Sequence, residues 1–350
     1  MNTLTSVLDE TTASPVESSR PEAGRRPAGS PTPRAAVFAG PGEIRIEEVD
    51  LVEPGPGEVR VRLEGCGVCA SNIPVWEGRP WFDYPMKPGA PGHEGWGIVD
   101  AVGEGVDHLS EGDRVAMLSY HAYATHDTAP ANAVVTLPLA LKDRPFPGEP
   151  LGCAINIFKR SDIEAGQTVV VIGVGFLGAL LTKLATHAGA RVLAISRRPY
   201  SLEVAREAGA AECIPLDDHW KIIEQVKSLT RGRMCDRVIE ATGKQGPLDL
   251  AGELTRERGR LMIAGYHQDG LRQVNMQLWN WRGIDVINAH EREPEVYVLG
   301  ICDAVNATLE GSLDARPLFT HRFSLDELSE ALRMTRDRPD GFMKALIMMD

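Results

Sequence analysis

A short apolar run that leads into a glycine-rich turn constrains the fold of this 350-residue chain more than any other feature. Residues 168–173 (TVVVIG) have the composition of a buried strand, and residues 179–189 (ALLTKLATHAG) have helical spacing. A Gly-x-Gly-x-x-Gly turn between a strand and a helix lets the backbone approach a pyrophosphate at a helix N-terminus. We therefore predict a dinucleotide-binding loop. Its residues are Gly173, Gly175, Phe176, Leu177 and Gly178.

Patterns on either side of this turn divide the chain. Residues 155–294 alternate apolar strands with amphipathic helices, which predicts a doubly wound parallel sheet that binds the nucleotide. Residues 34–154 begin with short alternating runs separated by Gly and Pro, which predicts a mostly β, barrel-like unit. Residues 1–33 lack apolar periodicity and predict a disordered tail. Residues 295–350 contain two helical stretches and a final strand.

Composition excludes some classes of partner. The net charge of −12 argues against a nucleic-acid surface, because phosphate binding needs clustered Lys and Arg. No apolar run is long enough to span a bilayer, and the first ten residues lack the pattern of a secretory signal. The six cysteines therefore indicate metal ligands or free thiols rather than disulfides. We expect a cytoplasmic homodimer or homotetramer that acts on a small molecule.

The strand after the glycine turn ends in Ser196, Arg197 and Arg198. A site for NAD usually has Asp or Glu here, to hold the ribose hydroxyl groups. Two guanidinium groups would instead bind a 2′-phosphate, and no carboxylate would repel it. The sequence predicts NADP as the cofactor, with NAD less favoured.

Cys69 and His93 are good zinc donors that lie in a loop-rich stretch. They belong to a series of motifs that occur in one order along the chain. The series is GVCAS at 67–71, GHEGWG at 92–97, VG at 102–103, GDRV at 112–115, EPL at 149–151 and the glycine turn. In this order the motifs resemble the zinc-containing medium-chain dehydrogenase/reductase family, which includes the alcohol dehydrogenases. The resemblance covers residues 34–350 and is closest to polyol and sugar dehydrogenases.

The resemblance implies a GroES-like catalytic domain, a Rossmann domain, and a C-terminal segment that returns to the catalytic domain. It places Cys69 and His93 at zinc-ligand positions and Glu94 at a glutamate that neighbours or binds the metal. Ser71 takes the place of the hydroxyl that exchanges a proton with the substrate oxygen. Lys344 stands where a basic residue often faces the cofactor phosphates.

The third zinc ligand is either Glu149 or Cys153. Polyol-type members resemble the EPL motif, with the glutamate near the metal, whereas simple alcohol-type members have a cysteine at the position of Cys153. On a helix the two residues would share one face, at i and i+4. The EPL spacing favours Glu149, and Cys153 would then be a small buried residue.

Several positions depart from the family pattern. Asn72 replaces a frequent Asp, and Pro74 lies near the place of a relay histidine, so His121, His126 or solvent would carry the proton onward. No four-cysteine cluster follows the GDRV motif, so we expect one catalytic zinc per chain.

Four aromatic residues between the ligand motifs are candidates for the substrate pocket or for the core. They are Trp76, Trp81, Phe82 and Tyr84.

The resemblance implies zinc-dependent hydride transfer between NADP(H) and a secondary alcohol or carbonyl, with a polyol, sugar or cyclitol as the favoured substrate. One alternative is a zinc-free enone or quinone reductase on the same fold. The other is a non-catalytic binding protein. Retention of Cys69, His93 and Glu94 argues against both.

Overall fold

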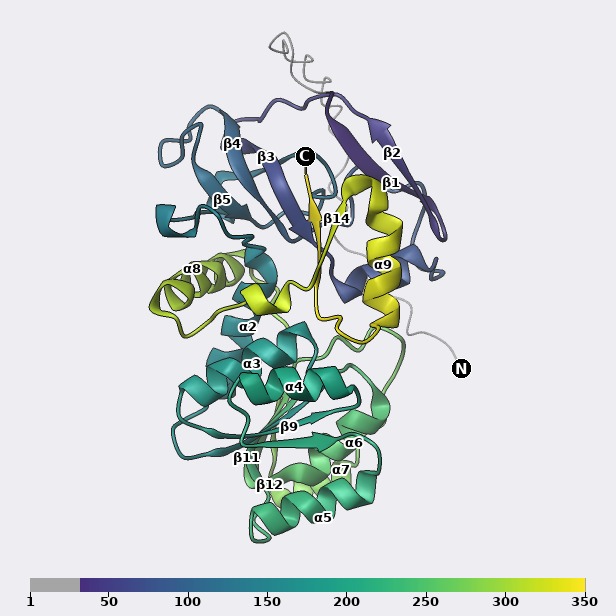
Figure 1. Ribbon diagram of the computed structural model, residues 1–350, viewed down its shortest axis with the longest axis vertical. Coiled ribbons are helices and arrows are strands. Elements are labelled where there is room, and N and C mark those ends of the chain that lie inside the picture. Colours follow the sequence, from purple (N-terminus) through teal and green to yellow (C-terminus); the bar gives the residue numbers. More distant parts are fainter. Residues whose placement is uncertain (1–31, 350) are drawn as a thin grey trace.

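The computed structural model describes residues 32–349, which form two lobes that meet at a helical junction (Figure 1). The predicted tail over residues 1–33 lies almost entirely outside the described residues. No helix within the described range has the length and hydropathy needed to cross a membrane.

The β lobe contains a seven-stranded sheet with the strand order β14-β15-β3-β4-β5-β7, in which β6 also pairs with β3. A separate hairpin, β1 and β2, lies beside it. The strands are β1 (Arg34–Gly40), β2 (Glu43–Glu48), β3 (Glu58–Gly67), β4 (Gly95–Val102), β5 (Arg114–Met117), β6 (His126–Pro130), β7 (Val134–Thr136), β14 (His321–Ser324) and β15 (Ala345–Met348). The C-terminal strands thus return to the N-terminal lobe, where Ile347 of β15 is opposite Cys66 of β3.

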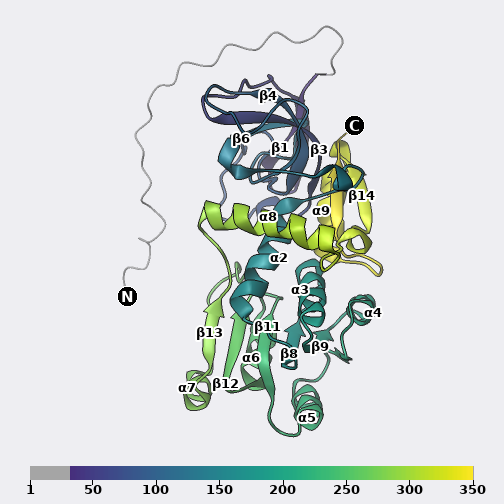
Figure 2. The same cartoon turned by 90° about the vertical axis from the view of Figure 1, so that its left-hand side faces the viewer.

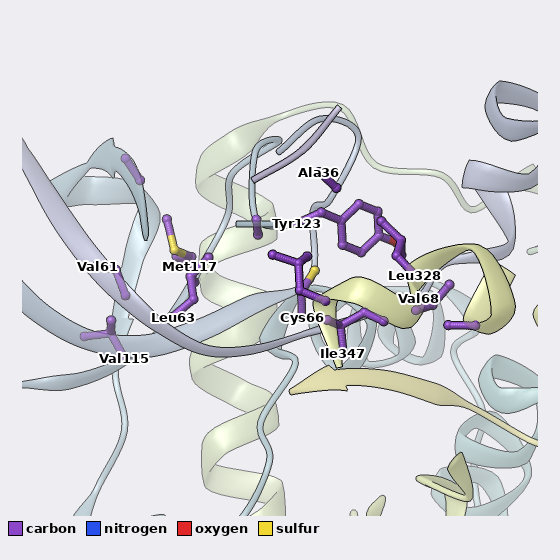
Figure 3. Packing of buried hydrophobic residues seen from close by; sticks show 14 of the residues in the cluster. Ala36, Val61, Leu63, Cys66, Val68, Val115, Met117, Tyr123, Leu328 and Ile347 are labelled. Atoms are coloured by element: carbon purple, nitrogen blue, oxygen red, sulfur yellow. The ribbon is translucent and has the colours of Figure 1, made fainter. Parts of the chain in front are cut away.

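The core of the β lobe lies between these strands and α9 (Leu328–Asp337). Figure 3 shows Cys66 and Tyr123 packed among aliphatic side chains such as Ile347 and Leu328. All four are fully buried. Cys66 is therefore a core thiol, and burial raises its pKa well above the usual range.

The second lobe is a six-stranded parallel sheet with the order β10-β9-β8-β11-β12-β13, and the predicted α/β fold class is confirmed. Its strands are β8 (Thr168–Ile172), β9 (Arg191–Ser196), β10 (Glu212–Pro215), β11 (Cys235–Glu240), β12 (Thr255–Ile263) and β13 (Asp285–Asn288). Its helices are α3 (Phe176–His187), α4 (Pro199–Glu207), α5 (His219–Leu229), α6 (Gln245–Leu254) and α7 (Met276–Arg282). From β8 the chain adds β9 and β10 on one side and then crosses over to add β11, β12 and β13 on the other. Such folds bind their ligands where the strand order reverses in this way, here between β8 and β11. The glycine turn follows β8 at this point.

Two long helices, α2 (Gly148–Ser161) and α8 (Pro294–Glu310), cross at the junction of the lobes (Figure 2). The crossing is close because glycines line it: a Cβ on Gly152 would lie 2.8 Å from the backbone nitrogen of Ile301. Leu151 and Ile155 of α2 share one core with Leu180 of α3. The predicted domain boundary at 154/155 falls inside α2, which is continuous between the lobes.

Candidate metal and cofactor site

The structure brings Cys69, His93 and Glu94 together, with one ligand atom from each within 4.8 Å of the others. This is the only such group among residues 32–349. Antiparallel pairing explains the meeting, because Cys66 near the end of β3 is opposite Gly95 at the start of β4. The loop that leaves β3 and the loop that enters β4 therefore lie side by side.

Glu94 is fully buried, and Lys344 Nζ lies 2.6 Å from its carboxylate. Gly67 makes room for that carboxylate, since a Cβ at Gly67 would lie 1.8 Å from Glu94 Oε2. Burial lowers the pKa of Lys344, but the charges of Glu94 and Cys69 outweigh burial and the net shift is upward. The structure thus places Lys344 at the metal cluster, and its contact with the cofactor phosphates stays a prediction.

His93 has the environment of a metal ligand. Its Nδ1 lies 2.9 Å from the carbonyl oxygen of Pro91, which leaves Nε2 to face the cluster. Burial lowers the pKa of His93, but the nearby Cys69, Glu149 and Glu94 raise it to about 10. Negative groups therefore surround this imidazole and favour a cation at their centre.

Both candidates for the third ligand lie on the first turns of α2. Cys153 Sγ donates a hydrogen bond to Glu149 Oε1 at 3.1 Å, and the Tyr297 hydroxyl of α8 lies beside Cys153. Burial and the charge of Glu149 raise the pKa of the Cys153 thiol well above the usual range. Burial also raises the pKa of Glu149, while His93 opposes this shift.

The residues at this centre fit a zinc ion. A thiolate, an imidazole and carboxylates are its usual ligands, and a catalytic site uses three of them and keeps one position for substrate. Ser71 follows Cys69 closely, in the 3-10 turn Ala70–Asn72, and is half-buried.

The other candidates from the sequence lie apart from the cluster. His121 and His126 are outside it, and His126 Nε2 is 3.5 Å from Asp100. Three of the four aromatic residues, Trp76, Phe82 and Tyr84, pack against the core of the β lobe. Trp81 is 58% exposed.

The three glycines of the turn serve different needs. Gly173 has φ +94°, which favours glycine. A Cβ on Gly178 would lie 2.1 Å from the carbonyl oxygen of Gly173, so this glycine permits close packing of helix and strand. Gly175 has open space beside it, and α3 begins at the next residue, Phe176. The open side at a helix N-terminus is where a pyrophosphate would sit.

Ser196 at the end of β9 is buried and Arg197 is exposed. Arg198 Nη1 donates to the carbonyl oxygen of Phe342 at 2.6 Å and so connects the parallel sheet to the C-terminal segment. Burial lowers the pKa of Arg198, and the positive charge of nearby Arg338 lowers it further. Sequence reasoning did not identify Arg338, which follows α9 and approaches this site only through the fold.

A buried network at the carboxyl edge of the sheet was also missed. Glu240, at the end of β11, accepts hydrogen bonds from the backbone nitrogens of Thr242 at 2.6 Å and Gly243 at 3.0 Å. His267 Nε2 lies 2.9 Å from Glu240, and Arg272 Nε donates to His267 Nδ1 at 2.9 Å. These bonds order the loops beside the glycine turn. The sequence signal that could have revealed this network is Glu240 itself, a glutamate at the end of an apolar strand.

Two family models match separate parts of the chain. A model described as alcohol dehydrogenase GroES-like domain matches residues 55–138, and one described as zinc-binding dehydrogenase matches residues 177–297. The chain belongs to the zinc-containing medium-chain alcohol dehydrogenase family. It is therefore an oxidoreductase of the alcohol and polyol dehydrogenase type, and a zinc ion and a nicotinamide cofactor are typical of this family.

Relatives of this dehydrogenase match along most of their length. Sorbitol dehydrogenase of Gallus gallus is 27% identical over 341 residues, covering 86% of this chain and 93% of the relative. The (R,R)-butanediol dehydrogenase of Neisseria gonorrhoeae is 26% identical over 339 residues, covering 84% and 93%. A solved structure from Sinorhizobium meliloti 1021, named as a zinc-binding dehydrogenase bound to NADP, has a TM-score of 0.80 at 23% identity and covers 91% and 100%. The last similarity supports the fold.

Proposed function

We propose that this dehydrogenase transfers hydride reversibly between NADP(H) and a secondary alcohol or ketone of a polyol, sugar or cyclitol. The observation that carries the proposal is the position of Lys344. Its Nζ contacts Glu94 of the metal cluster and lies 5.0 Å from the ring centroid of Phe176, at the start of the cofactor helix. The metal-type ligands and the nucleotide loop therefore adjoin, as hydride transfer between a metal-held alcohol and a nicotinamide requires.

In this proposal Cys69, His93 and Glu149 hold zinc. Cys153 supports the choice of Glu149, because its thiol donates to that carboxylate and so orients it. A bound zinc supplies Lewis acidity that stabilises negative charge on the substrate oxygen. Ser71 relays the proton from that oxygen, giving up its own hydroxyl proton to solvent, and Lys344 neutralises the buried charge of Glu94.

The substrate class rests on two kinds of support. The EPL motif at 149–151 is of the polyol type, and the relatives include proteins named for sorbitol and butanediol. The hydroxyl of Tyr297 lies beside Cys153 and Glu149, and in this proposal it binds a second hydroxyl group of a polyol. A panel of polyols, cyclitols and simple alcohols would identify the substrate, and a preference for simple alcohols would contradict this assignment.

The preference for NADP rests on positive charge at the end of β9. Arg197 is exposed, and the cations Arg198 and Arg338 lie near it. We expect kcat/KM to be higher with NADP than with NAD, and Arg197→Ala to reduce that preference about 10- to 100-fold, since a charge-assisted hydrogen bond contributes about 1.5–3 kcal/mol. Arg333→Ala is the matched control, because Arg333 is an exposed arginine that pairs with Glu330. Equal or better use of NAD by the natural protein would contradict the proposal.

We also propose a cytoplasmic homodimer or homotetramer. Strand β13 lies at the edge of the parallel sheet, with one neighbour, β12. Large apolar side chains are exposed nearby in sequence, with Leu271 at 100%, Met276 at 60% and Trp281 at 85%. An edge strand beside exposed apolar groups favours association. Sedimentation of the purified protein as a monomer would contradict this.

A further inference from the structure

We propose that Tyr123 is a positioning residue of the metal centre, which acts through Asn72 and Pro91 to fix the orientation and tautomer of His93. The inference rests on the proposed function in one respect, namely that a metal binds at the Cys69–His93 cluster. Because Tyr123 lies on a loop after β5, far from the ligand motifs in sequence, no motif assigns it a role.

The geometry forms a continuous chain of hydrogen bonds. The Tyr123 hydroxyl donates to Asn72 Oδ1 at 2.7 Å, and Asn72 Nδ2 donates to the carbonyl oxygen of Pro91 at 3.2 Å. His93 Nδ1 lies 2.9 Å from the same carbonyl oxygen. Tyr123 is fully buried and Asn72 is 2% exposed, so water does not compete for these groups.

Each bond in the chain has one allowed direction. The carbonyl oxygen of Pro91 can only accept, so both Asn72 Nδ2 and His93 Nδ1 must carry the protons. The Tyr123 hydroxyl can donate to Asn72 Oδ1, and this bond keeps the amide from reversing and presenting an oxygen to Pro91. The proton on His93 Nδ1 leaves the lone pair on Nε2 for the metal.

In this chain of hydrogen bonds the neutral Asn72 takes the place of the Asp that is frequent in the family. A hydroxyl, an amide and a carbonyl orient His93, and the loop that carries Pro91 is held on the same residue, since the Tyr123 backbone nitrogen donates to the carbonyl oxygen of Gly89 at 3.0 Å. The centre therefore depends on the exact hydrogen-bonding direction of Asn72 rather than on a carboxylate charge. Loss of such outer partners typically reduces metal affinity about 10- to 100-fold.

The decisive variant is Tyr123→Phe, which removes the hydroxyl and keeps the ring in the core, where its centroid lies 6.4 Å from that of Phe38. The matched control is Tyr84→Phe. The Tyr84 hydroxyl also donates to a backbone carbonyl of the β lobe, that of Val75, but has no bond to the chain that reaches His93.

Two readouts follow the metal without activity: the zinc affinity by competition with a chromogenic chelator, and the absorption spectrum of the cobalt-substituted protein. We expect Tyr123→Phe to lower zinc affinity about 10- to 100-fold and to alter the cobalt spectrum, while Tyr84→Phe matches the natural protein. NADPH binding should be unchanged in both, which shows that they fold. Natural zinc affinity and an unchanged cobalt spectrum in Tyr123→Phe would overturn the inference.

If Tyr123→Phe loses NADPH binding, the same two readouts on Asn72→Ala decide the question: weaker zinc binding supports the inference, and natural binding overturns it. Absence of zinc from the natural protein would instead contradict the proposed function. Natural zinc content with no effect in these variants would contradict only the role of Tyr123.

Discussion

The glycine turn and the metal cluster lie next to each other but are built in opposite ways. The turn is one contiguous segment, Gly173–Gly178, whose geometry follows from a strand, a positive φ and a helix start. The metal cluster instead depends on distant parts of the chain, since Glu94 of the cluster pairs with Lys344, 250 positions further along. A local site depends on its own backbone, whereas a dispersed site depends on the whole fold that brings its members together.

This difference implies that the two sites can be damaged separately. Removing a metal ligand leaves the strand, turn and helix intact, so cofactor binding should survive. Adding a side chain at a glycine of the turn leaves β3, β4 and α2 intact, so metal binding should survive. Variants that fail to separate the two functions would break the comparison.

The largest expected effect comes from Cys69→Ala. Without the thiolate ligand, the substrate oxygen loses the Lewis acid, and we expect kcat to fall roughly 1000-fold, the equivalent of about 4 kcal/mol of transition-state stabilisation. NADPH affinity, measured by fluorescence titration, should stay within about twofold, since adjoining sites that are built separately should lose function separately. Cys213→Ala, which removes a free cysteine of the parallel sheet, is the control. If Cys69→Ala retained turnover or lost NADPH binding, the metal site and the cofactor site would not be separate in the way proposed.

Two glycine variants test the cofactor turn, and their expected effects are smaller than that of Cys69→Ala. Gly178→Ala should lower the free energy of unfolding by about 1–3 kcal/mol, because its Cβ would meet the Gly173 carbonyl oxygen at 2.1 Å. Gly175→Ala has open space, so stability should be unchanged, but the methyl group would occupy the pyrophosphate position and weaken NADPH binding about tenfold or more. Thermal unfolding and NADPH titration measure the two effects. Equal destabilisation by both variants, or a loss of zinc in either, would count against this account.

The sequence predicted most of the fold and the place of the glycine turn in it. The alternation of strands and helices gave the parallel sheet, and the glycine turn lies where the pattern placed it, because both are short-range features of the chain. Helix α7 and strand β13 were not identified. Strand β13 is only four residues long, and α7 covers seven residues with polar neighbours.

The metal cluster was predicted in part. Cys69, His93 and Glu94 came from motifs, but the contact of Lys344 with Glu94 depends on β15 pairing with β3, which no local pattern encodes. The roles proposed for Tyr123 and Tyr297 depend in the same way on tertiary packing. Helical spacing put Glu149 and Cys153 on one face, yet only the structure shows that the thiol donates to the carboxylate.

X-ray absorption at the zinc edge of the freshly purified protein tests the central claim most directly, because it detects the metal and counts its sulfur ligands. We predict about one zinc per chain with a single sulfur ligand, from Cys69, at about 2.3 Å and nitrogen or oxygen ligands at about 2.0–2.2 Å. Two sulfur ligands would assign Cys153 rather than Glu149 to the metal. Absence of zinc would contradict the account of the site as a whole and favour a zinc-free reductase.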